Sequence, residues 1–115
     1  MTVTIYHNPR CSKSRQTLEF LRRRGIEPQV IEYLQTPPSE ADLKRILGLL
    51  GMAPRDLMRR GEPAYKERGL DDPALSQEAL IAAMVESPIL IQRPIVLAND
   101  KAAIGRPPES VLGIL

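Results

Sequence analysis

A β-strand, a turn, a helix and a second β-strand follow one another at the start of the chain, and this succession most constrains the fold. Residues 3–6 are β-branched or aromatic and indicate a strand, which Asn8 and Pro9 break. Apolar residues then recur at helical spacing over about residues 12 to 24, with Gly25 placed as a cap. Residues 29–34 indicate the second strand. Such close spacing predicts two parallel strands joined by a right-handed crossover.

The middle of the chain predicts helices and no strands. Ser39 and Asp42 have the spacing of a capping box, and Gly51 ends the helix that they open. Ser76 is a candidate N-cap for a later helix. The expected helices are 39–50, 54–60 and 75–85. The pattern does not assign residues 65–70.

The last part of the chain predicts a β-hairpin and a short helix. Residues 95–98 and 101–104 read as two strands, and Asn99 and Asp100 between them tolerate the positive φ of a two-residue turn. Residues 109–115 then predict a helix. Its expected core-facing residues are Val111, Leu112 and Leu115.

This order of elements is that of a thioredoxin-like fold, an α/β class with a mixed four-stranded sheet. We expect a single thioredoxin-like domain over residues 1–115, with a helical insertion at about 39–86 between the β-α-β half and the β-hairpin-α half. A chain of 115 residues with 43% hydrophobic residues suits one core.

Composition narrows the classes of function. A net charge of +2 and four aromatic residues argue against nucleic-acid binding, which usually needs a basic face or stacking platforms. The sequence contains no signal-peptide pattern and no membrane-length apolar run, so we expect a cytoplasmic protein. We also expect no bound metal or other cofactor, since one Cys and one His make no typical zinc site.

Cys11 is the only cysteine, and it stands where the first strand ends and the first helix begins. A helix N-terminus stabilises a thiolate, and so do the neighbouring cations Arg10, Lys13 and Arg15. We therefore predict a nucleophilic Cys11 with a lowered pKa, the alternative being a structural cysteine. Ser14, in the second cysteine position of a C-x-x-C spacing, can donate to a thiolate or a bound oxyanion but cannot resolve a disulfide.

His7 is the only histidine, and it lies close to Cys11 in the sequence. It either supports the thiolate or caps the end of the strand. Arg59, Arg93 and Arg106 stand at element ends and are candidates for binding an oxyanion, because arginine binds tetrahedral oxyanions bidentately. The alternative for each is an ordinary surface arginine.

Pro94 follows Arg93 at the start of a predicted strand. In the thioredoxin-like fold a proline at that place stands opposite the nucleophile. We therefore predict a cis peptide bond before Pro94, against a low general frequency of cis bonds.

Motifs along nearly the whole chain resemble those of the glutaredoxin-linked arsenate reductase family, which has a thioredoxin-like fold. They are His7-Asn8-Pro9-Arg10-Cys11-Ser12-Lys13-Ser14-Arg15, Glu27-Pro28, Tyr33-Leu34, Pro37-Pro38, Arg55-x-Leu-Met-Arg59, Arg93-Pro94-Ile95-Val96 and Arg106-Pro107. Many family members carry Gly-Thr at Ser12-Lys13, and many have a C-terminal extension, so we expect a short variant.

The resemblance implies that Cys11 attacks arsenate, that Arg59, Arg93 and Arg106 bind it, and that arsenite is released. Glutathione would be the co-substrate and glutaredoxin the partner. We also expect a monomer that binds neither nucleic acid nor membranes. Two alternatives stay open: a regulator of the same fold that binds RNA polymerase, and a glutaredoxin-like thiol-transfer protein. The first needs a C-x-x-C pair, which Ser14 breaks.

Overall fold

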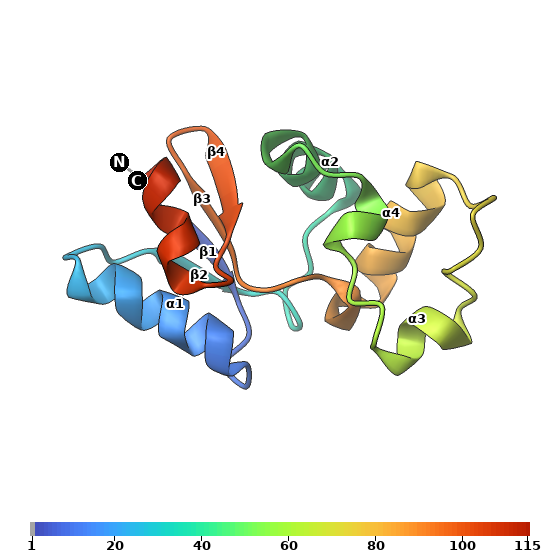
Figure 1. The fold of residues 1–115 in the computed structure, drawn as a ribbon, viewed down its shortest axis with the longest axis horizontal. Coiled ribbons are helices and arrows are strands. Elements are labelled where there is room, and N and C mark those ends of the chain that lie inside the picture. Colours follow the sequence, from blue (N-terminus) through green and yellow to red (C-terminus); the bar gives the residue numbers. More distant parts are fainter. Residues whose placement is uncertain (1) are drawn as a thin grey trace. The chain divides into compact units, whose positions relative to one another are not determined.

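The computed structural model describes residues 2–115 and contains two compact units (Figure 1). The first unit combines the chain up to Thr36 with Arg93–Leu115, and the second is Pro37–Gln92. The predicted helical insertion, about 39–86, lies inside the second unit.

The first unit contains a mixed four-stranded sheet in the order β2-β1-β3-β4. Its strands are β1 (Thr4–His7), β2 (Gln29–Glu32), β3 (Ile95–Ala98) and β4 (Lys101–Ile104). β1 runs parallel to β2 and antiparallel to β3, and β4 is antiparallel to β3. The predicted turn between β3 and β4 is confirmed, with φ of 53° at Asn99 and 57° at Asp100.

Two helices cover one face of this sheet: α1 (Ser12–Arg23) and the 3₁₀ helix η3 (Pro108–Ile114) (Figure 1). Between helices and sheet lies an aliphatic core of Val3, Ile5, Leu21, Val96, Ala98, Val111 and Ile114. Gly25, at φ of 77°, follows α1 in the left-handed conformation that suits glycine.

The last helix differs from the prediction in type and in the face that it buries. In η3, Val111 and Ile114 are buried, whereas Leu112 is 42% exposed and Leu115 is only partly buried. A 3₁₀ helix has three residues per turn, so residues 111 and 114 share a face. The prediction that Leu112 faces the core is therefore wrong.

The second unit is helical, as predicted. Its elements are α2 (Glu40–Leu50), η1 (Pro54–Leu57), α3 (Pro63–Glu67), α4 (Gln77–Glu86) and η2 (Pro88–Leu90). The predicted capping box is confirmed, because Ser39 Oγ accepts from the Asp42 N–H at 3.0 Å and Asp42 Oδ2 accepts from the Ser39 N–H at 3.1 Å. Ser76 also caps α4, accepting from the Ala79 N–H.

The predicted helix over 54–60 is shorter than expected. The 3₁₀ turn η1 ends at Leu57, and Met58 is extended and pairs in a β-bridge with Ile91. The Arg59 N–H then donates to the carbonyl of Leu90 at 2.7 Å. Long-range backbone pairing therefore replaces the last helical turn that sequence spacing favours.

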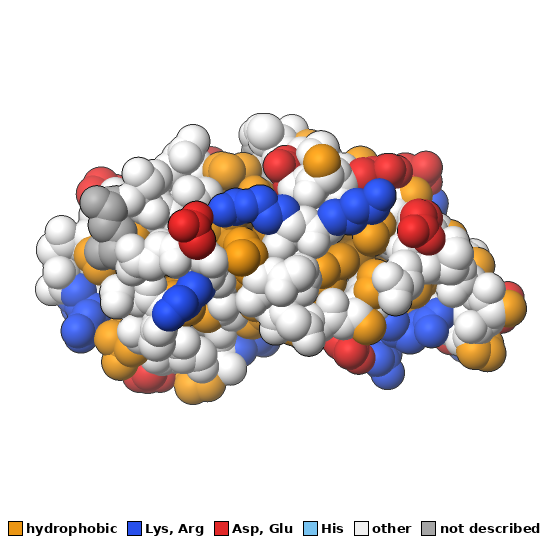
Figure 2. Space-filling model, turned by 90° about the horizontal axis from the view of Figure 1, so that it is seen from above, with side chains coloured by type: hydrophobic (Ala, Val, Ile, Leu, Met, Phe, Trp, Pro, Cys, Tyr) orange, Lys and Arg blue, Asp and Glu red, His pale blue; other side chains and the backbone are white. Residues whose placement is uncertain are grey.

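The sheet order and the helices on it give the thioredoxin-like α/β fold that the order of elements predicts. On the face seen in Figure 2, Lys and Arg side chains alternate with Asp and Glu rather than forming one basic field. No helix within residues 2–115 is long and apolar enough to cross a membrane.

Candidate active site

The loop between β1 and α1 holds Cys11 by backbone and side-chain hydrogen bonds. The Cys11 N–H donates to the Asn8 carbonyl at 3.0 Å, and the Arg10 N–H donates to Asn8 Oδ1 at 3.0 Å. Arg15 Nη1 donates to the carbonyl of Pro9 at 2.9 Å. A short polar loop closed in this way fixes the residue that precedes the helix.

Cys11 is the N-cap residue of α1, with extended backbone, and its side chain makes no capping bond. The thiol is half-buried. At this position Sγ lies beside the first N–H groups of the helix, which have no partners within the helix. The sequence prediction that Cys11 stands at the start of the helix is confirmed.

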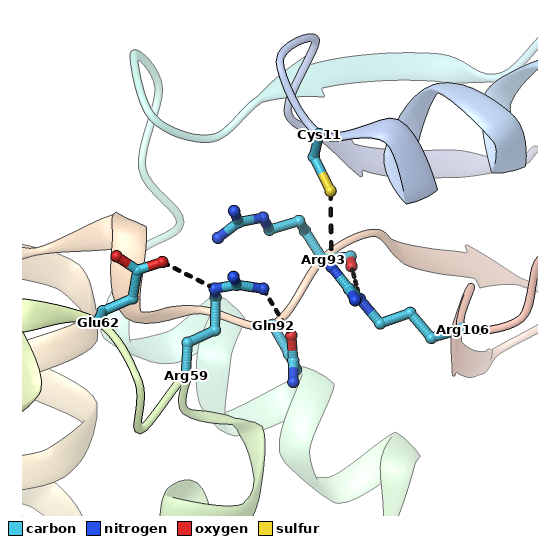
Figure 3. A network of polar contacts seen from close by, with 6 residues as sticks. All are labelled: Cys11, Arg59, Glu62, Gln92, Arg93 and Arg106. Carbon is cyan, nitrogen blue, oxygen red and sulfur yellow. Dashed lines mark hydrogen bonds and ion pairs between the residues drawn. The ribbon is translucent and has the colours of Figure 1, made fainter.

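A guanidinium group contacts the Cys11 thiol from the β-hairpin side of the same unit (Figure 3). Arg106 Nη2 lies 3.5 Å from Sγ, and the Arg93 side chain lowers the pKa of the thiol. Arg106 Nε donates to the Arg93 carbonyl at 2.7 Å, which fixes how its guanidinium is turned. Two of the three predicted arginines therefore meet at Cys11.

These contacts change the acidity of Cys11. Burial alone would raise the pKa of the thiol. The backbone N–H of Ser14, the Arg93 side chain and then the backbone N–H of Lys13 lower the pKa of the thiol, and together they outweigh burial. The pKa of Cys11 therefore lies below its ordinary value, as the sequence predicts.

Ser14 and His7 form a buried pair behind the thiol. Ser14 Oγ lies 2.6 Å from His7 Nδ1 and accepts from the Asn8 N–H at 3.0 Å. Ser14 is fully buried, and His7 is 6% exposed. The Ser14 hydroxyl thus holds the loop, while its N–H is one of the groups that lower the pKa of Cys11.

Burial is the main cause that lowers the pKa of His7; Glu32 opposes it, and Arg22 and Arg15 add to it. The imidazole is therefore neutral at neutral pH. Ser14 Oγ accepts from the Asn8 N–H and also pairs with Nδ1, and the tautomer of the imidazole decides which of these two atoms donates. This geometry supports the structural reading of His7.

Pro94 and Gly105 connect the two arginines to the sheet. The Arg93–Pro94 peptide bond is cis, as predicted, and the Arg106–Pro107 bond is cis as well. The Gly105 N–H donates to the Pro94 carbonyl at 2.9 Å. A Cβ on residue 105 would lie 2.4 Å from Thr17 Oγ1 and 2.9 Å from Pro94 Cγ, so only glycine fits before Arg106.

The sequence reading missed the role of Gly105. Thr17 Oγ1 donates to its carbonyl at 3.2 Å, across 88 residues of sequence. The only signal in the sequence is a glycine directly before the Arg106-Pro107 pair.

Arg59 belongs to the second unit, where acidic and amide groups hold it (Figure 3). Its Nε donates to Glu62 Oε1 at 3.0 Å, and its Nη1 donates to Gln92 Oε1 at 3.2 Å. Arg60, its neighbour, is exposed and pairs with Asp56 at 3.5 Å. Arg59 is thus more firmly held than Arg60, and its role toward arsenate stays a prediction.

Within residues 2–115, no three His, Cys, Asp or Glu side chains gather as metal ligands would. The groups around Cys11 are guanidinium and backbone N–H groups.

A family model describing the ArsC family matches residues 6–114. The chain belongs to the ArsC family. An arsenate reductase from Neisseria meningitidis serogroup A is 51% identical over 98% of this chain and 97% of its own length. The Escherichia coli K12 protein YfgD, described as uncharacterized, is 59% identical over 98% of this chain and 96% of its own length.

A solved structure in the ArsC family agrees closely with this fold. The arsenate reductase from Vibrio cholerae superposes with a TM-score of 0.98 at 57% identity, over all of this chain and 98% of the other. The thioredoxin-like fold is therefore shared throughout the matched length.

Proposed function

We propose that this chain is an arsenate reductase. The observation that carries the proposal is the contact between Cys11 Sγ and the exposed guanidinium of Arg106 at 3.5 Å. Membership of the ArsC family and close relatives named arsenate reductases support the same substrate.

Electrostatics explains why a thiolate needs these arginines. Arsenate and a thiolate are both anions, so their approach is repulsive without fixed cations. Arg93 and Arg106 supply positive charge at Sγ, and a planar guanidinium donates two parallel hydrogen bonds to an oxyanion. Arg59 is proposed as a third arsenate ligand, as the family resemblance implies.

In the first step, the Cys11 thiolate attacks arsenic and forms a sulfur–arsenic bond. One arsenate oxygen leaves with protons as water, and arsenic keeps its oxidation state. The N–H groups of Lys13 and Ser14, together with Arg93, favour the attacking thiolate. Arg106 stabilises the charge on the arsenate oxygens.

In the second step, glutathione thiolate attacks the Cys11 sulfur of the adduct. A disulfide bond forms, the sulfur–arsenic bond breaks, and its electron pair stays on arsenic, which leaves as arsenite. The two thiols together lose two electrons, and arsenic gains them. The two thiol hydrogens and one arsenate oxygen account for the water.

The third step restores the thiol. Ser14 cannot form a disulfide and Cys11 is the only cysteine, so the mixed disulfide needs a thiol from another molecule. A glutaredoxin thiolate takes the glutathione and releases the Cys11 thiolate.

The test is arsenate-dependent NADPH oxidation, coupled through glutathione, glutaredoxin and glutathione reductase. Wild type should turn over, while Cys11→Ser should stay at background. Arg106→Lys keeps the charge but loses the planar fork. It should raise the KM for arsenate and leave the melting temperature close to that of wild type. Equal rates for wild type and Cys11→Ser would reject the proposal and leave the two non-reductase alternatives.

A further inference from the structure

The first unit contains an open groove that the steps above do not use. It has a volume of about 740 Å³ and lies between the outer face of α1 and the start of η3. We define the α1 groove by Arg15, Glu19, Phe20, Arg24, Pro108 and Glu109. Its volume is in the range of sites for small ligands, about 300–1,000 Å³.

Both walls of the α1 groove begin next to the reactive sulfur. Arg15 follows Cys11 by four residues, so it lies one turn further along the same face of the helix. Pro108 follows Arg106 by two residues, and Arg106 contacts Sγ. A ligand in the near part of the groove is therefore within reach of Cys11.

The lining carries fixed groups of both charges. Arg15 uses Nη1 for the Pro9 carbonyl, one of five guanidinium N–H donors. Arg24 stacks on the ring of Phe20, with Cζ at 5.5 Å from the centroid. Glu19 is paired with Arg23 at 3.0 Å, whereas Glu109 on the facing wall is exposed.

This set of groups suits a short peptide with free carboxylates and an ammonium group. Carboxylates bind to arginine in bidentate fashion, an ammonium group pairs with a carboxylate such as Glu109, and the Phe20 ring offers an apolar surface. Cys11 is the only cysteine in the chain, so its reaction with arsenate needs a thiol from another molecule.

We propose that the α1 groove binds the reducing co-substrate, a small zwitterionic thiol peptide, and presents its sulfur to Cys11. The inference rests on the proposed function, because only the arsenic adduct of Cys11 requires this thiol. Attack by the bound thiolate on the Cys11 sulfur forms the mixed disulfide, breaks the sulfur–arsenic bond and releases arsenite.

The binding test needs no arsenate. S-methylglutathione, which has no free thiol, is titrated into wild type and followed by amide chemical shifts. We expect saturable shifts at residues of the α1 groove and about tenfold weaker binding in Arg24→Gln/Glu109→Gln. Arg22→Gln, an exposed arginine of α1 paired with Glu27 outside the groove, is the matched control and should bind as wild type does.

The kinetic test separates the thiol from arsenate. In Arg24→Gln/Glu109→Gln, which leaves the Cys11 loop intact, the KM for glutathione should rise about tenfold while the KM for arsenate stays unchanged. With 2-mercaptoethanol, a neutral thiol, the double variant and wild type should have equal rates. An equal loss with both thiols would indicate damage to Cys11 and overturn the inference.

The outcomes distinguish the two proposals. No saturable shift, or shifts confined to residues outside the α1 groove, overturns the groove assignment even if arsenate is reduced. Saturable binding in the groove without any arsenate reduction overturns the proposed function and retains the peptide site.

Discussion

Ser14 Oγ and His7 Nδ1 lie 2.6 Å apart inside the protein, so a serine hydroxyl is hydrogen-bonded to the single histidine of the chain. The same hydroxyl accepts from the Asn8 N–H. One buried oxygen therefore joins the end of β1, the loop and the first turn of α1.

Ser14→Ala should destabilise the protein by about 1–3 kcal/mol, because it leaves the buried Asn8 N–H without its acceptor. Urea unfolding followed by circular dichroism measures the change. Ser12→Ala, at an exposed position one residue after Cys11, is the control and should change little. Equal stability of Ser14→Ala and wild type would show that water replaces the hydroxyl.

The rate of alkylation of Cys11 should have its midpoint below the ordinary thiol pKa, since the folded protein lowers this pKa. Arg93→Ala should move the midpoint upward, and Lys101→Ala, which removes an exposed cation of β4, should not. Iodoacetamide labelling against pH, read by mass spectrometry, gives both midpoints. An unchanged midpoint in Arg93→Ala would remove Arg93 from the stabilisation of the thiolate.

Linkage gives the pH dependence of stability a definite sign. Because the folded pKa of Cys11 is lowered, the thiolate stabilises the fold fully above the unfolded pKa of the thiol. This contribution is lost as the pH falls through the folded pKa. The free energy of unfolding of wild type, minus that of Cys11→Ser, should therefore rise with pH across this window, as denaturant titrations at several pH values would measure.

Gly105→Ala should cost about 1–3 kcal/mol of stability, because the new Cβ would overlap Thr17 Oγ1 and Pro94 Cγ. Adding Thr17→Ala removes the closest contact and should restore part of the loss. Gly113→Ala, with open space around its Cβ, is the control. Thermal unfolding measures the stability of the three variants. A double variant with the same melting temperature as Gly105→Ala would place the strain at Pro94.

Arg59→Ala should lower kcat/KM for arsenate by about 10–100-fold, the value of about 1.5–3 kcal/mol that a charged hydrogen bond carries. Arg60→Ala should change it little, since its exposed pair with Asp56 contributes little. The coupled assay compares the two variants at matched melting temperature. Equal activity of Arg59→Ala and wild type would remove Arg59 from the proposed set of arsenate ligands.

Local chemistry was enough to predict several elements in both units. The strand, turn and helix around Cys11, the Asn99-Asp100 turn and the Ser39 capping box all depend on neighbours within a few residues. The cis bond before Pro94 followed only from the expected fold. The strand, the helix, the turn and the capping box could be predicted because short-range spacing determines them.

Contacts between distant residues were not predictable in this way. The hydrogen bond from Thr17 to Gly105 joins residues 88 positions apart and exists only after β3 and β4 pair with β1. A serine hydroxyl at position 14 could donate to the thiolate, but in the folded loop the Ser14 hydroxyl pairs with His7. The 3₁₀ period of η3, which buries Ile114 and exposes Leu112, likewise has no clear local signal.

Residues 105 and 106 are neighbours under opposite constraints. Gly105 is buried with no room for a methyl group, whereas the side chain of Arg106 is exposed. A library randomised at both codons and sorted for cellular abundance should return almost only glycine at 105 and many amino acids at 106. Sorting the same cells for survival on arsenate should then narrow position 106, which would separate selection for folding from selection for chemistry within one dipeptide.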